Sequence, residues 1–204
     1  ANPPGAILKS TLLFGVDMRN ANLSNANLQG ANLSWADLTN ATLWRAFAIS
    51  LEGECPAALP TQWDCIPLPR GKLLLVGPGA NLWGVNLSGA DLSGVDLSQA
   101  ALAYANLTGA NLTGTNLTGA ILHHTNLTDA IITNANLTDA ILHDANLTNA
   151  TVTDANFTGA DLTDSVQTGA NMSEALFCSV DMDCADSDPC TTNTCVSGTC
   201  ELAE

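Results

Sequence analysis

A period of five residues is the feature that most constrains how this chain can fold. It is clearest where ANLSN at 21–25 is followed by ANLQG at 26–30 and ANLSW at 31–35. A helix repeats its faces about every 3.6 residues and a strand about every 2, so a period of five fits neither element. The chain must therefore turn a corner in each repeat and wind into a coil.

The repeat assigns one kind of residue to each position. The pattern A-[N/D]-L-x-x has central residues at 8, 13, 18, 23, 28, 33, 38 and 43, resumes one residue out of phase at 82, and runs every five residues to 182. The small residue and the central Leu are expected to point inward, and the polar residues and Gly to face water. Gln167 takes a central position, where we expect a buried amide without a partner, at a cost of about 1–3 kcal/mol.

These repeats closely resemble the motif of the pentapeptide-repeat family, over most of the chain. The resemblance implies an all-β fold, namely a right-handed quadrilateral β-helix (solenoid) with four pentapeptide repeats per coil and about seven coils. Residues 20 apart would then stack at the inter-strand spacing of about 4.8 Å, with backbone hydrogen bonds between coils. The resemblance also implies a binding role, since some relatives present an acidic, DNA-like rod to type II topoisomerases.

The pattern divides the chain into four segments. They are a first solenoid block at 1–48, an inserted Pro- and Gly-rich loop at 49–79, a second block at 80–182, and a cysteine-rich segment at 178–204. Cys55 and Cys65 lie in the loop with no third cysteine nearby, so we expect a disulfide between them. The alternative is two free thiols.

The C-terminal segment carries the other five cysteines, which resemble the small cysteine-rich modules of bacterial extracellular proteins. Disulfide pairs are expected among Cys178, Cys184, Cys190, Cys195 and Cys200, although five cysteines cannot all pair internally. Four nearby carboxylates are candidate Ca²⁺ ligands, namely Asp181, Asp183, Asp186 and Asp188. The alternative is a solvated acidic loop, and no other cofactor is expected.

The cysteine content and the net charge limit where the protein can be located and which partners it can bind. The clustered cysteines favour an oxidising compartment, so the protein is predicted to be extracellular, periplasmic or at the cell surface. The net charge is -15, and no basic residue follows Lys72, which argues against direct nucleic-acid binding. No apolar run approaches the roughly 20 residues of a membrane span. The start at Ala1 fits either a mature secreted chain or an excised fragment.

With four repeats per coil, one column of the second block differs from the others. It is centred on Leu82, Leu102, Leu122, Leu142 and Leu162, and it gathers all the histidines and the only Tyr of the chain. We expect an interaction face formed by Trp83, Tyr104, Ile121, His123, His124, Ile141, His143 and Asp144. The alternative is drift at exposed positions. His123, His124, His143 and Asp144 would form a two-by-two cluster close enough to share a metal ion, although exposed histidines near an Asp are ordinary.

The remaining columns repeat the same polar residues in each coil, which predicts polar ladders with a structural role. One contains Asn86, Asn106, Asn126 and Asn146, and another contains Asn116, Asn136 and Asn156. In the first coil, Ile7 and Leu12 occupy outward positions where Asn or Asp is the rule, and predict an end contact. Either the 49–79 loop folds back to cover them, or a second molecule docks there head to tail.

No nucleophile, base and orienting group can be assembled from the sequence, so the chain is predicted not to be an enzyme. The favoured function is a non-enzymatic extracellular structural or interaction scaffold, with end-to-end self-assembly as a further expectation. Its partner would be another protein or a second copy of itself. The alternatives are a DNA-mimicking topoisomerase-binding protein, for which Asp91, Asp96 and Asp161 supply charge, and a passive spacer.

Overall fold

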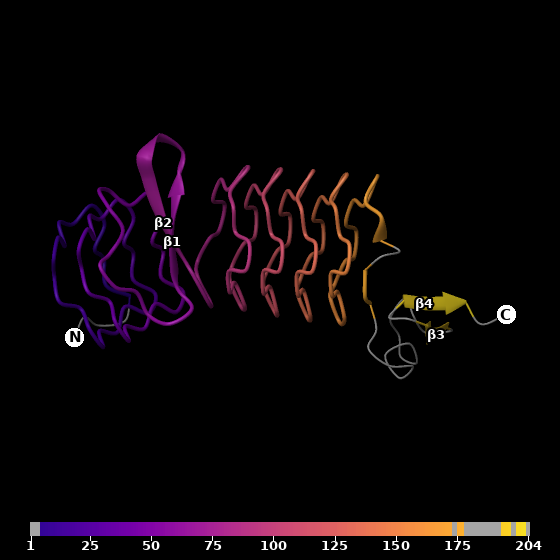
Figure 1. Ribbon diagram of the computed structural model, residues 1–204, viewed down its shortest axis with the longest axis horizontal. Coiled ribbons are helices and arrows are strands. Elements are labelled where there is room, and N and C mark those ends of the chain that lie inside the picture. The colour runs from indigo at the N-terminus through magenta and orange to yellow at the C-terminus, as the bar shows by residue number, and fades with distance from the viewer. Residues whose placement is uncertain (1–4, 173–174, 178–192, 197–198, 203–204) are drawn as a thin grey trace.

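The backbone of the repeats forms a right-handed quadrilateral β-helix, seen as a rod in Figure 1. The computed structural model describes residues 5–172, 175–177, 193–196 and 199–202. Parallel bridges join residues that lie 20 apart, as in Asn86 to Asn106, Asn106 to Asn126 and Asn126 to Asn146. One coil therefore takes four repeats, as the sequence predicts, and neighbouring coils pair like strands of a parallel sheet.

Each repeat ends in a corner that explains its polar positions. The second residue after the central one has a positive φ, for example 57° at Asn134 and 63° at Gly84. Gly, Asn and Asp tolerate this left-handed conformation best. In the same repeat, the Asn or Asp before the Leu accepts a hydrogen bond from the backbone two residues on, as from Thr108 N–H to Asn106 Oδ1 at 3.1 Å. The polar residues of the motif therefore form the turns.

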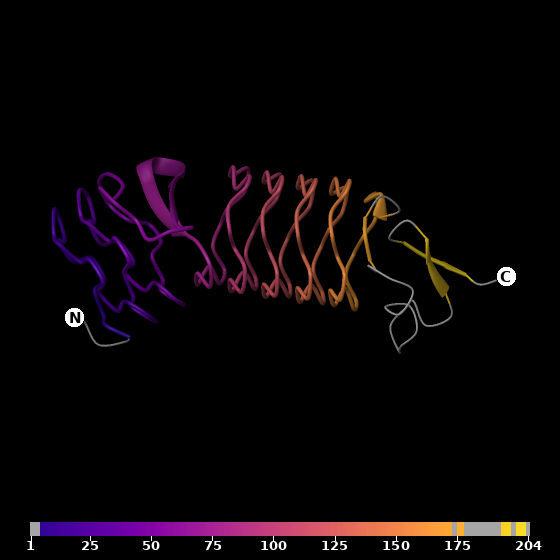
Figure 2. The same ribbon diagram turned by 60° about the horizontal axis from the view of Figure 1, so that its bottom comes forward.

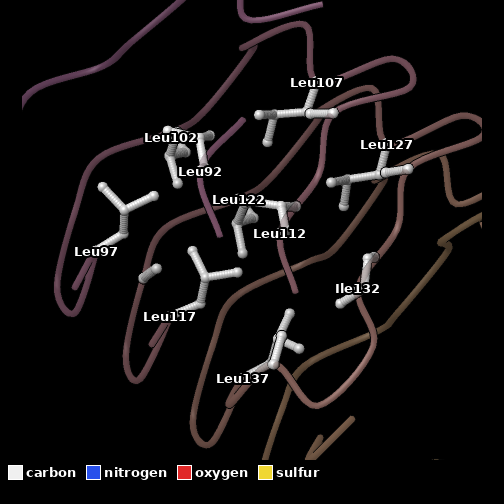
Figure 3. Packing of buried hydrophobic residues seen from close by; sticks show 14 of the residues in the cluster. Leu92, Leu97, Leu102, Leu107, Leu112, Leu117, Leu122, Leu127, Ile132 and Leu137 are labelled. Atoms are coloured by element: carbon white, nitrogen blue, oxygen red, sulfur yellow. The ribbon is translucent and has the colours of Figure 1, made fainter. Parts of the chain in front are cut away.

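The core is a narrow stack of the central residues. In Figure 3, Leu97, Leu117 and Leu137 follow one side of the coil, while Leu107 and Leu127 point in from another. The central residues of the second block from Leu82 to Phe157 have at most 1% of their surface exposed. The inward placement of the small and central residues is therefore confirmed.

Polar residues at inward positions find partners. Thr115 and Thr125 stand where Ala is the rule, and their hydroxyls donate to the Leu92 and Leu102 carbonyls at 2.8 and 2.9 Å. The expectation that Gln167 is a buried amide without a partner is wrong. Gln167 is only half-buried, and its Nε2 donates to Ser165 Oγ at 2.8 Å.

A hairpin interrupts the solenoid between the two blocks, and it projects from one side of the rod in Figures 1 and 2. It consists of β1 (Asp64–Leu68), the 3-10 turn η1 (Pro69–Gly71) and β2 (Lys72–Val76), with β1 antiparallel to β2. Before it, Glu52 and Ala58 still bridge to Asn32 and Asp37 of the preceding coil. The start of the expected 49–79 loop thus continues the first block.

The side chains of β2 alternate between the two cores. Leu75 is buried in the cluster of the first block, whereas Leu74 and Val76 are buried in that of the second. The hairpin therefore lies between the blocks and does not fold back over the first coil. Ile7 and Leu12 remain 83% and 81% exposed, so the expectation that this segment covers them is wrong.

The cysteines and the C-terminal segment are described in part. Cys55 and Cys65 are joined as a disulfide, with their Cα atoms 5.9 Å apart. Two strands, β3 (Asn193–Val196) and β4 (Thr199–Leu202), pair antiparallel with Cys195 opposite Cys200 in the backbone register. The other cysteines of this segment and its four candidate calcium ligands lie outside the described residues. Within the described part of the chain, no helix is long and apolar enough to cross a membrane.

Candidate functional site

The predicted interaction face belongs to a column of the rod that runs without a break past the hairpin. Backbone N–H groups donate from Phe47 to the Ala26 carbonyl and from Asn81 to the Ala46 carbonyl, at 2.9 and 3.2 Å. Ala101 then donates to Ala80 at 2.9 Å, and the column continues by bridges through Ile121 and Ile141 to Asp161. The ladder thus fixes which side chains of successive coils meet.

Five rings on this column form one connected cluster, which we call the aromatic strip: Trp83, Tyr104, His123, His124 and His143. The Trp83 and Tyr104 centroids lie 5.8 Å apart, and Tyr104 stacks on His124 at 4.8 Å. In the next pair, His123 stacks on His143 at 5.0 Å with planes 6° apart. The five rings therefore form a continuous cluster over four successive coils.

Two rings of the strip occupy corner positions at a conformational cost. Tyr104 and His124 have φ values of 61° and 55°, where most other corners use Gly, Asn or Asp. For a residue with a Cβ, this conformation costs roughly 1–2 kcal/mol. Trp35, Arg45 and Gln99 occupy equivalent corners outside the strip with φ values of 63°, 56° and 59°, so this conformation belongs to the corner and is not specific to the face.

The histidines differ in their surroundings. His143 Nδ1 lies 3.1 Å and His124 Nε2 3.7 Å from Asp144 Oδ2, and all three side chains are partly exposed. His123 is half-buried, and its buried Nδ1 has no hydrogen-bond partner among the residues that the structure describes. Burial, reinforced by the nearby His143 and His124, lowers the pKa of His123, while Asp144 opposes the shift. The predicted two-by-two cluster thus divides into a triad and a covered fourth ring.

Ile121 and Ile141 flank the strip at the positions before the central Leu, and they bridge to each other. Ile121 is half-buried, whereas Ile141 is 37% exposed. They add aliphatic surface beside the histidines, as predicted. All eight residues of the expected face lie on one column.

Other faces carry the polar ladders that the sequence predicts. Asn106 Nδ2 donates to Asn86 Oδ1 at 3.2 Å, and Asn136 Nδ2 donates to Thr118 Oγ1 at 3.0 Å. These ladders confirm side-chain hydrogen bonding along the rod. Asp91, Asp96 and Asp161, by contrast, belong to three different ladders, so they do not form a single acidic stripe.

A groove that the sequence did not reveal lies at the junction of the two blocks. Its volume is about 580 Å³, and it is lined by Asn25, Asn27, Arg45, Phe47, Asn81 and Trp83. It extends the strip toward the first block, because Trp83 belongs to both. The repeat pattern is lost between 49 and 79, so the juxtaposition is revealed by the structure, in which the Asn81 N–H donates to the Ala46 carbonyl.

Comparisons with known proteins agree with this architecture. A family profile described as pentapeptide repeats matches in 8 copies, over residues 6–45, 79–103, 96–134, 129–164 and 155–186. A comparison with curated proteins gives no match.

Several solved structures are similar to parts of the chain. A pentapeptide repeat protein from the Arabidopsis thaliana thylakoid lumen is 27% identical, with a TM-score of 0.47, over 58% of this chain and 86% of that one. HetL, a pentapeptide repeat protein involved in heterocyst differentiation regulation in a Nostoc cyanobacterium, is 26% identical, with a TM-score of 0.30, over 86% of both chains. QnrB1, a plasmid-mediated fluoroquinolone resistance protein, is 17% identical, with a TM-score of 0.31, over 82% of both chains.

Proposed function

This chain belongs to the pentapeptide-repeat family, and we propose that it is a rigid, non-enzymatic scaffold that binds a protein partner through the aromatic strip. The observation that carries the proposal is the ring cluster itself. Five rings form one connected cluster on one column, whereas the other columns of the second block carry mainly Asn, Asp, Ser, Thr and Gly at their outward positions, with Ile131 an exposed apolar exception. Aromatic residues are enriched at protein interfaces and dominate their binding energy.

Rigidity supports the same role. Backbone hydrogen bonds of about 2.6–3.1 Å join each coil of the second block to the next, so the rings are presented in a fixed arrangement. A preformed surface binds with less loss of conformational entropy than a mobile one.

We place the scaffold outside the cytoplasm, at the cell surface or in the extracellular medium. Support comes from the clustered cysteines and from the bond between Cys55 and Cys65, since disulfides persist mainly in oxidising compartments. Mass spectrometry of non-reduced peptides from the natively produced protein tests this. Recovery of both residues as alkylated thiols would favour a cytosolic location and would revive the topoisomerase alternative.

Site-specific photo-crosslinking tests the binding surface. A photoreactive phenylalanine replaces Tyr104 in the full chain expressed in its native host, and illumination is followed by identification of the attached protein. The matched control carries the same group at Asn134, which also has a positive φ of 57° but lies two repeats round the coil, on the opposite face.

The proposal predicts that one discrete protein is attached from position 104 and that none is enriched from position 134. Equal labelling from both positions, or no product from position 104 at any expression level, would contradict it.

A second role, self-association, is favoured by one specific observation at the N-terminal end. Ile7, Leu12 and Phe14 of the first described coil are 83%, 81% and 64% exposed. Among the described residues, the backbone of this coil pairs only with the following coil, as in the bridges from Ile7 to Asn27 and from Leu12 to Asn32. An apolar, half-paired β edge invites another chain, and we propose a second copy of this one.

A further inference from the structure

We propose that His124, His143 and Asp144 bind a single divalent transition-metal ion, with Zn²⁺ the ion that best matches these ligands. This goes beyond the scaffold role, because the isolated chain would bind the ion without any protein partner. The three residues come from two adjacent coils of the column that carries the aromatic strip.

The geometry is close to that of a three-ligand site. One ligand atom from each residue can be chosen so that all three lie within 4.8 Å of one another. The nitrogens nearest to Asp144 Oδ2 are His143 Nδ1 at 3.1 Å and His124 Nε2 at 3.7 Å. Ligand atoms of tetrahedral Zn²⁺, each about 2.0–2.1 Å from the ion, lie roughly 3.3 Å apart. Small side-chain rotations at this partly exposed surface are therefore sufficient.

The ladder brings the ligands together and the neighbouring rings hold them. The backbone N–H of His124 donates to the backbone carbonyl of His143 at 3.1 Å, which fixes the two coils in register. Tyr104 stacks on the ring of His124, and His123 stacks on the ring of His143. Each imidazole thus rests on another ring, and supporting contacts of this kind preorganise metal ligands.

The ligand chemistry selects the class of ion. Two imidazoles and one carboxylate suit Zn²⁺, Cu²⁺ and Ni²⁺, whereas Ca²⁺ requires six to eight oxygen ligands. Three protein ligands leave at least one coordination position for water or for a group of another molecule.

Calorimetric titration of the full chain with Zn²⁺ tests the site, with excess Ca²⁺ present and free thiols alkylated so that other donors are occupied. The variants His124→Asn, His143→Thr and Asp144→Asn replace each ligand by a residue that the chain already uses at the equivalent position, as at Asn134, Thr153 and Asn149. Each is therefore expected to fold. The matched control is His123→Thr, which removes the neighbouring ring outside the triad.

The proposal predicts one Zn²⁺ per wild-type chain, with selective shifts of the His124 and His143 ring resonances in NMR spectra. Each ligand variant should weaken binding more than about 100-fold, whereas His123→Thr removes only a supporting ring and should weaken it less than any ligand variant does, within the roughly 10–100-fold that supporting residues contribute. Equal binding by the wild type and the three ligand variants would overturn the site. An equal loss in His123→Thr would overturn the assigned ligand set.

Discussion

Each corner of the coil depends on a single residue in the left-handed region, and this position accepts rings as well as Gly, Asn and Asp. Most corners use Gly, Asn or Asp, which adopt a positive φ at low cost. Tyr104 and His124 occupy the same position and place their rings on the strip. At the residue scale, the face therefore combines corner rings with Trp83, His123 and His143, which directly follow a central Leu and are not at corners.

Gly79 is a corner that cannot accept a side chain. A Cβ built there would lie 2.1 Å from the ring of Trp44, whereas one at Gly114 would meet nothing within 4 Å, and both residues have a positive φ. Gly114→Ala should cost roughly 1 kcal/mol for its conformation, and Gly79→Ala about 1–3 kcal/mol more for the collision. Thermal unfolding of both variants measures the difference, and equal melting temperatures would mean that Trp44 moves aside freely.

Asp17 gives a pH-dependent prediction. The Arg19 side chain and backbone N–H donate to its carboxylate and lower its pKa to about 2, from 3.8. Since the folded pKa is below the unfolded one, this pairing stabilises the protein fully above pH 3.8, and the effect is lost as the pH falls toward 2.

NMR titration of Arg19→Gln should show the pKa of Asp17 raised toward 3.8, without reaching it because the backbone bond remains. Asp91 is the matched control, because hydrogen bonds from Ser93 and Asn111 lower its pKa without an arginine. An unchanged Asp17 titration in the variant would show that Arg19 does not bind it in solution.

At the scale of elements, β2 joins two solenoid blocks that the sequence pattern leaves separate. Successive side chains of a strand point to opposite sides, so Leu73 and Leu75 pack toward the first core and Leu74 and Val76 toward the second. Residues 73–76 thus contribute side chains to the cores of both blocks. The strand also explains why the interaction column stays in register across the interruption.

Truncation within β2 should therefore act on one block at a time. Leu75→Ala is expected to increase hydrogen exchange mainly in the first block, and Leu74→Ala mainly in the second, with each change costing about 2–5 kcal/mol. Hydrogen exchange followed by mass spectrometry resolves the two regions. Identical protection patterns in the two variants would mean that the rod unfolds as one unit and that β2 is not a joint between blocks.

The regular elements were predictable from the sequence and the joint was not, for a physical reason. Burial of Leu and turn formation by Asn and Gly act within one repeat, so the period reveals coil and faces. Between 49 and 79 there is no period, so the sequence does not show that Asn81 is placed to donate to the Ala46 carbonyl of the first block. Likewise, the column predicted which rings share a face, but not that His123 stays outside the triad of His124, His143 and Asp144.

At the scale of the whole molecule, the rod carries the aromatic strip on one column and exposed apolar side chains at its first described coil. The face belongs to the second block, and the exposed Ile7 and Leu12 belong to the first described coil. Binding through the face and self-association through the end would therefore be separable. A rod that assembles end to end would repeat its face along a fibre.

Self-association is expected to depend on Ile7 and Leu12. The double variant Ile7→Asn/Leu12→Asn restores the residue type usual at these outward positions, so its fold should be kept while its apolar end is lost. Light scattering coupled to size-exclusion chromatography should show concentration-dependent oligomers for the wild type and monomers for the variant. A strictly monomeric wild type at high concentration would refute the assembly.

The most direct test of the scaffold measures the affinity of the partner identified by photo-crosslinking for a variant that lacks the aromatic strip. Trp83→Ser, Tyr104→Gly, His123→Thr, His124→Asn and His143→Thr together give this face the residues used on the opposite one, and EDTA in all samples removes any contribution from metal. If the strip is the binding surface, the Kd should rise more than about 100-fold with the β-helix intact by circular dichroism, since loss of a few interface hot spots exceeds 2.8 kcal/mol. A Kd within about threefold of the wild-type value would show that the partner binds elsewhere on the rod and would contradict the account.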